Sequence, residues 1–155
     1  MSENTASSDM LLSFLREYDV AALSTIMPGN VAHGTAIYYY VDEDFNFYFL
    51  TKSETLKFKN IETNNSASLV VIDQETLQTV QVDGVAEEVD YKNEYASQLQ
   101  MYNQTLARNR QEWHKVPLTH VPGSEWTFVK VTPKWMRWTD YKNWEHSIKF
   151  EHKFS

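Results

Sequence analysis

The feature that most constrains this chain is a series of short runs rich in β-branched and aromatic residues, separated by turn-forming residues. The runs 20–27 and 31–41 flank the turn sequence 28–30, Pro-Gly-Asn, and predict an antiparallel hairpin. A third run, 45–50, follows three acidic residues and alternates so that its phenylalanines share one face. We expect a three-stranded antiparallel meander as the simplest arrangement of these runs.

The second half of the chain contains further runs of the same kind. An almost continuous apolar run, 67–73, precedes a longer alternating run, 79–89, in which Gly84 indicates a bulge or a barrel corner. Two further runs, 126–132 and 134–140, are separated by a proline and predict two separate strands. Together these runs predict six to seven antiparallel strands.

Three segments carry helical rather than strand periodicity. Residues 8–18 place apolar side chains at helical spacing, with Ser8 as the expected N-cap. Residues 55–65 predict a helix of two or three turns, and residues 91–109 predict a longer one.

The resulting fold class is α+β, mostly β, with one barrel and peripheral helices. We expect residues 1–155 to form a single domain, with 1–8 as a flexible tail.

Composition restricts the function classes. The chain has 155 residues, 42% of them hydrophobic, and no cysteine, so it folds without disulfides or thiolate-bound metals. Its five histidines are scattered without metal-ligand spacing, and no metal is expected. A net charge of -7 disfavours nucleic acid as a partner. Without a basic leader or a long apolar run, we expect a cytoplasmic protein that does not contact membranes.

The segment 47–61 carries the clearest chemical signal, because an aromatic strand runs into a hydroxyl-rich loop and then into a helix. A helix start presents unpaired N–H groups and a partial positive charge, which suit a phosphate. Thr51 and Thr55 add hydroxyl groups, and Lys57 adds a cation that opposes the helix dipole unless an anion lies nearby. An ordinary N-cap beside a solvated lysine face explains the same residues equally well.

A strand that ends in Thr51 and is followed by Thr55, Lys57, Asn60 and Ile61 resembles the FMN-binding split-barrel family of pyridoxamine 5′-phosphate oxidase and its relatives, including general stress protein-like members. The resemblance covers roughly residues 10–90 and extends weakly into 126–140. It implies a split β-barrel, FMN as cofactor and a homodimer with the flavin at its interface.

The resemblance also implies a set of site residues. The flavin phosphate would lie at the start of the second helix, the ring along the second strand, and a tryptophan and an arginine near the C-terminus would come from the other subunit. Leu56 stands where the family has a phosphate-binding arginine. The cofactor-binding residues implied are Thr35, Ala36, Ile37, Tyr38, Leu50, Thr51, Thr55, Leu56, Lys57, Trp135 and Arg137.

The implied reaction is FMN-dependent oxidation or reduction of an unidentified small molecule, with NADPH or NADH as a possible electron donor. The long helix lacks the family's substrate-phosphate motif, and Thr139 stands where the family has a histidine, which argues against oxidation of pyridoxamine 5′-phosphate itself. No catalytic acid or base is assigned. The alternatives are a non-catalytic flavin-binding or stress-response module, and a split barrel adapted to heme or a deazaflavin.

Overall fold

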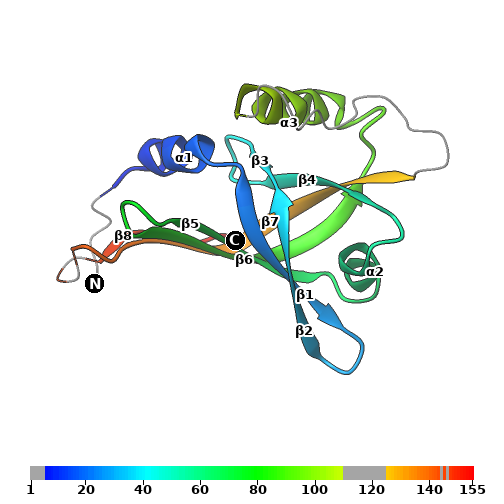
Figure 1. Ribbon diagram of the computed structural model, residues 1–155, viewed down its shortest axis with the longest axis horizontal. Coiled ribbons are helices and arrows are strands. Elements are labelled where there is room, and N and C mark those ends of the chain that lie inside the picture. Colours follow the sequence, from blue (N-terminus) through cyan, green and yellow to red (C-terminus); the bar gives the residue numbers. More distant parts are fainter. Residues whose placement is uncertain (1–5, 110–124, 144, 146) are drawn as a thin grey trace.

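A computed structural model of the protein describes residues 6–109, 125–143, 145 and 147–155. Within them, eight strands form one curled antiparallel sheet with the order β2-β1-β5-β6-β7-β4-β3, and β8 pairs with β7 (Figure 1). The mostly β, split-barrel class is thereby confirmed. The strands are β1 (Val20–Met27), β2 (Val31–Tyr38), β3 (Tyr40–Val41), β4 (Phe47–Lys52), β5 (Ser66–Asp73), β6 (Gln78–Val89), β7 (Trp126–Asp140) and β8 (Ile148–Lys153).

The first hairpin forms as predicted. β1 pairs with β2 along its whole length, from Val20 opposite Tyr38 to Met27 opposite Val31. The turn between them holds Gly29 at φ 84° and Asn30 at φ 61°, two residue types that tolerate left-handed backbone. Local turn chemistry therefore sets the register of this edge of the sheet.

The predicted meander is wrong, because β4 pairs with β3 and β7 instead of β2. The chain turns sharply at Asp42, whose carboxylate accepts hydrogen bonds from the backbone N–H groups of Asp44 and Asn46. Phe45 takes a left-handed conformation in this turn, at φ 63°, so the strand starts at Phe47. The turn closes a short hairpin in which Tyr40 of β3 pairs with Tyr48 of β4.

The last predicted pair of strands is one strand, β7, which continues through Pro133. Pro133 lies between Val131, where pairing with β4 ends, and Trp135, where pairing with β8 begins, so its missing N–H interrupts neither ladder. On the other side it faces Gly84, where β6 has the predicted irregularity in register. A Cβ at this glycine would collide with the backbone of β7.

Three helices cover the sheet: α1 (Ser8–Glu17), α2 (Leu56–Thr63) and α3 (Ala96–Asn109). The first is capped by Ser7 instead of Ser8, and Ala6 donates a backbone hydrogen bond to the β8 carbonyl of Lys149 at 3.0 Å. The third helix begins later than predicted, after turns over 91–95. None of the helices in the described ranges has the length and apolar character needed to cross a membrane.

Aromatic side chains dominate the core between the helices and the sheet. Phe47, Phe49 and Phe128 are completely buried, and the Tyr102 ring of α3 packs edge-on against Phe128 at 5.8 Å. α1 and α3 lie on the same side of the curled sheet, and α2 packs against β1 (Figure 1). Each helix therefore brings a different set of polar side chains to the barrel surface.

Candidate functional site

The junction between β4 and α2 brings the predicted threonines together. Thr51, at the end of β4, is only 3% exposed, and its hydroxyl lies 3.1 Å from the hydroxyl of Thr55. Thr55 donates to the carbonyl of Lys52 at 2.8 Å, so Thr51 is the donor in the hydroxyl pair. Thr51 thus positions Thr55 from beneath, and Thr55 is the hydroxyl nearer the surface.

The start of α2 is an uncompensated positive end. Thr55 is the N-cap, yet its side chain makes no capping hydrogen bond, and the first turn carries no acidic residue. Lys57 in that turn is half-buried, and desolvation lowers the pKa of its ammonium group. The lysine and the helix end therefore present adjacent positive potential that an anion would neutralise.

Leu56, the predicted replacement for the family's arginine, occupies the first helical position and is 43% exposed. Its side chain offers neither a charge nor a hydrogen bond to a phosphate, although its backbone N–H belongs to the unpaired first turn. Lys52 does not supply the missing arginine charge at the helix start. Its ammonium lies instead over the Trp126 ring, 5.6 Å from the ring centroid. Lys57 is the cation within the helix turn itself, and Lys59 is exposed further along.

Asn60 holds α2 in place. Helical spacing places Asn60 on roughly the same side of the helix as Leu56, which is exposed, yet the structure buries Asn60 to 2% exposure. Its amide donates to the Thr25 hydroxyl on β1 at 3.0 Å, and Thr25 is itself 1% exposed. A polar residue on a short amphipathic helix gives no sequence signal of such a contact across the fold.

The predicted flavin-ring residues lie on β2, an edge strand. Ile37 is buried and faces the core, Thr35 and Tyr38 are partly buried, and Ala36 is exposed. Tyr39 follows the strand and packs on Phe47 of β4 at 5.2 Å. Leu50, also on β4, is partly buried against the core.

β2 and β4 approach each other at this ring contact, although they are not hydrogen-bonded neighbours. Around the sheet every successive pairing is antiparallel, so the two strands run in opposite senses. Thr35 lies four residues before Tyr39, and Thr51 lies four residues after Phe47. Both threonines are therefore on the same side of the contact, along the gap that splits the barrel.

The two C-terminal candidates lie elsewhere in the same chain. Thr51 pairs with Thr127 at one end of β7, and the strand from Thr127 to Trp135 spans about 26 Å. Trp135 and Arg137 both donate to the carboxylate of Glu151 on β8, each at 3.0 Å. Trp135 and Arg137 therefore lie away from Thr51, Thr55 and Lys57 within one chain.

Arg137 and Ala36 nevertheless share one face of the sheet. Side chains directly paired across antiparallel strands point to the same face. A continuous row of such pairs links the two residues: Ala36 with Ala22, Ala22 with Val70, Val70 with Gln81, and Gln81 with Arg137. The outer face of the barrel thus carries the predicted ring strand at one edge and the predicted arginine near the other.

A small cavity of about 120 Å³ lies between α1, α3 and β3, and sequence reasoning missed it. Two arginines, Arg16 and Arg108, line it together with Tyr40 and Thr105. The Nε atom of Arg16 is buried without a hydrogen-bond partner, and burial raises the pKa of the Tyr40 phenol. Its residues are far apart in sequence, so no local motif marks this second positive feature.

Acidic and histidine side chains do not gather into a group that could hold a metal ion anywhere in the described ranges.

Residues 8–137 match a protein-family model described as pyridoxamine 5′-phosphate oxidase. Among curated proteins, none matches the chain.

Several solved structures share its fold. General Stress Protein 26 from Bacillus anthracis is 16% identical with a TM-score of 0.68, over 95% of this chain and 98% of that one. An FAD-binding protein from Mesorhizobium loti is 17% identical with a TM-score of 0.66, over 86% and 92%. A heme binding protein from Mycobacterium smegmatis is 11% identical with a TM-score of 0.69, over 97% of this chain and 58% of that one. At these identities the likeness concerns the fold.

Proposed function

Because the chain belongs to the pyridoxamine 5′-phosphate oxidase family, we propose that it binds FMN, with the flavin phosphate at the N-terminus of α2. The observation that carries this proposal is the half-buried Lys57 beside an uncapped helix start. Lys57, the first-turn N–H groups and the Thr55 hydroxyl would hold the phosphate, and Thr51 would orient Thr55. Because Leu56 stands in place of the family's arginine, the site has one positively charged side chain fewer than the family pattern.

The isoalloxazine ring would lie along β2. Its backbone groups are available because β2 is an edge strand and pairs only with β1. Ala36 is exposed and small, so a flat ring can approach the strand there, while Tyr38 borders it. Bound FMN would supply hydride transfer, and the protein would supply position and exclusion of water.

A homodimer would complete the site. The outer face of the sheet exposes Val20 at 44% and Ile72 at 56%, next to the small residue Ala22. An apolar face of this kind favours burial against a second copy. A two-fold arrangement would let the partner supply Trp135 and Arg137, which one chain cannot bring to its own Thr55 and Lys57.

The activity we propose is FMN-dependent oxidation or reduction of a small molecule, with NADPH or NADH as electron donor. The cavity with Arg16 and Arg108 supports a substrate that carries a small anionic group. Its wall includes Tyr40, which lies two residues beyond Tyr38 on the proposed ring strand. A substrate anchored there would extend toward the flavin.

The test is a visible absorption spectrum of the purified protein, recorded with added FMN and then with NADPH or with NADH, each in the absence of oxygen. Resolved flavin bands that bleach with NADPH support a redox enzyme. Bound flavin that stays oxidised with both nicotinamide donors favours a binding module. Failure to bind FMN combined with a Soret band on addition of hemin would replace the proposal with heme binding, which the heme-binding neighbour makes the second candidate.

A further inference from the structure

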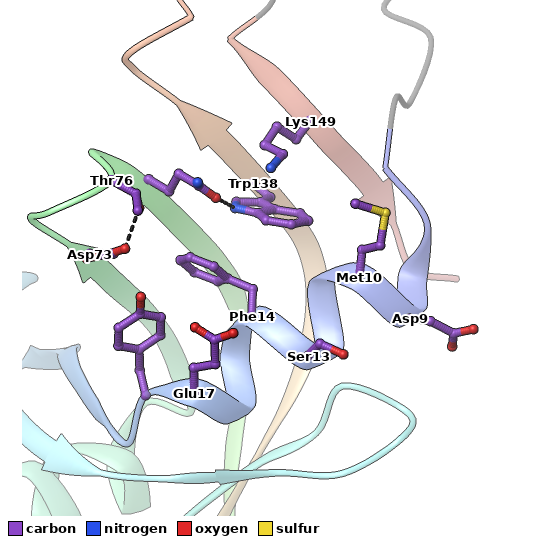
Figure 2. A pocket seen from close by; sticks show the side chains of 11 residues that line it. Asp9, Met10, Ser13, Phe14, Glu17, Asp73, Thr76, Trp138 and Lys149 are labelled. Carbon is purple, nitrogen blue, oxygen red and sulfur yellow. Dashed lines mark hydrogen bonds between the residues drawn. The ribbon is translucent and has the colours of Figure 1, made fainter.

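A second pocket, separate from the proposed flavin site, lies between α1, the β5–β6 turn and strands β7 and β8. Its volume is about 490 Å³, and it opens to solvent (Figure 2). Its residues come from α1, β5, β6, β7, β8 and the segments just after α1 and β5, and they include Phe14, Glu17, Tyr18, Asp73, Trp138 and Lys149. None of them is among the residues proposed to bind FMN.

Aromatic rings form the wall of this pocket. Phe14 packs on Trp138 at 5.1 Å between centroids and on Tyr18 at 5.0 Å. The indole N–H of Trp138 donates to Gln78 at 2.9 Å, which fixes the orientation of the ring (Figure 2). Trp138 is only 3% exposed and Phe14 8%, so the pocket is lined by small exposed parts of ring faces, which attract cations.

One ring of the wall already holds a cation. The ammonium of Lys149 lies over Trp138, 4.1 Å from the ring centroid. Lys149 comes from β8, at the margin of the sheet, and its side chain reaches into the pocket from one side (Figure 2). The chain thus demonstrates with its own side chain that an ammonium group fits this aromatic surface.

Carboxylates lie on the opposite side of Phe14 from Lys149. Glu17 is exposed beneath the Phe14 ring, and Asp73 lies at the β5–β6 turn (Figure 2). Hydrogen bonds from Thr76 and from Tyr18 hold the pKa of Asp73 below its ordinary value, so its carboxylate is charged at neutral pH. These neighbours already occupy its oxygens, so Asp73 would act on a ligand chiefly through its charge.

We propose that this pocket binds a small organic cation, namely an alkylammonium compound whose ammonium group lies on the aromatic wall and whose chain follows Met10 and Phe14. Glu17 and Asp73 supply the opposite charge. Lys149 competes with the ligand, because its own ammonium covers Trp138 in the free protein. This inference is independent of the FMN proposal.

The experiment titrates ¹⁵N-labelled protein with butylammonium chloride at constant ionic strength, with sodium chloride as the exchanged salt, and follows the indole N–H signal of Trp138. We expect a saturable shift of that signal. Lys149→Gln should tighten binding about twofold to fivefold, the scale of one exposed cation–π contact. Glu17→Gln should weaken binding by a similar factor.

Matched controls separate the site from the overall charge. Lys153→Gln removes the same charge from an exposed position on the same strand and should leave the affinity unchanged. 1-Butanol, which has the same chain without the charge, should give no saturable shift. Equal responses to Lys149→Gln and Lys153→Gln, or equal binding of 1-butanol, would overturn the proposal. Loss of FMN binding would not bear on it, because the two sites share no residue.

Discussion

The side-chain amide of Asn60 donates to the hydroxyl of Thr25 at 3.0 Å, and both residues are almost completely buried. This bond joins α2 to β1, the strand next to the proposed flavin strand. Because α2 is only two turns long and carries the proposed phosphate site at its start, its position depends on such anchors. The bond therefore connects the stability of the barrel to the geometry of the site.

Asn60→Ala should lower the free energy of unfolding by about 1–3 kcal/mol, since it leaves the buried Thr25 hydroxyl without its partner. FMN affinity should fall as well, because α2 loses its anchor. Urea denaturation and FMN titration measure the two effects. The control Thr63→Ala, at the exposed end of the same helix, should change stability by no more than about 0.5 kcal/mol. Equal stability of the two variants would contradict the anchoring role.

Lys57→Ala should weaken FMN binding by about 1.5–3 kcal/mol, the scale of a hydrogen bond to a charged group. Lys59→Ala removes the same charge from an exposed position on the same helix and should have an effect below about 0.5 kcal/mol. Isothermal titration calorimetry with FMN distinguishes the two. If both variants lost the same FMN affinity, Lys57 would act only through general electrostatic attraction and not through a specific contact.

Ala22→Glu should convert the proposed dimer into a monomer, because it places a charge beside the exposed apolar residues Val20 and Ile72 on the outer sheet face. Sedimentation equilibrium measures the change. Ala107→Glu adds the same charge on an exposed position of α3 and should leave the dimer intact. A wild-type protein that is monomeric with FMN bound would refute the interface itself.

Asp73→Asn should destabilise the protein at pH 7 and lose this effect in acid. The pKa of Asp73 lies below its ordinary value of 3.8 in the folded state, so its stabilising contribution is complete above that value. The contribution disappears as the pH falls through the folded pKa. Thermal unfolding of both proteins across the acid range measures this convergence, and a stability gap that stays constant down to the lowest pH would contradict it.

Local patterns were sufficient where a structure depends on neighbouring residues. The alternation of β1 and β2, and the turn residues Gly29 and Asn30, predicted the hairpin because strand period and left-handed turns are short-range properties. The Gly84 irregularity followed from the absence of a side chain. Thr51 and Thr55, which the sequence assigned to one site, lie in contact because only three residues separate them in the chain.

Contacts between distant segments could not be read in the same way. Periodicity states which residues share a face, but it does not identify the neighbouring strand, so the pairing of β4 with β7 and the strand β8 were missed. For the same reason nothing indicated that Glu151 binds Arg137, or that Arg16 and Arg108 line one cavity. Sites formed by residues from distant segments could therefore not be predicted from the sequence.

The most direct test of the central claim compares the affinity of the wild-type protein for FMN and for riboflavin, which share the ring and differ in the phosphate. If α2 binds the phosphate, FMN should bind at least about 100-fold more tightly, the equivalent of two hydrogen bonds to a charged group. Equal affinities would contradict a phosphate site at Lys57 and Thr55.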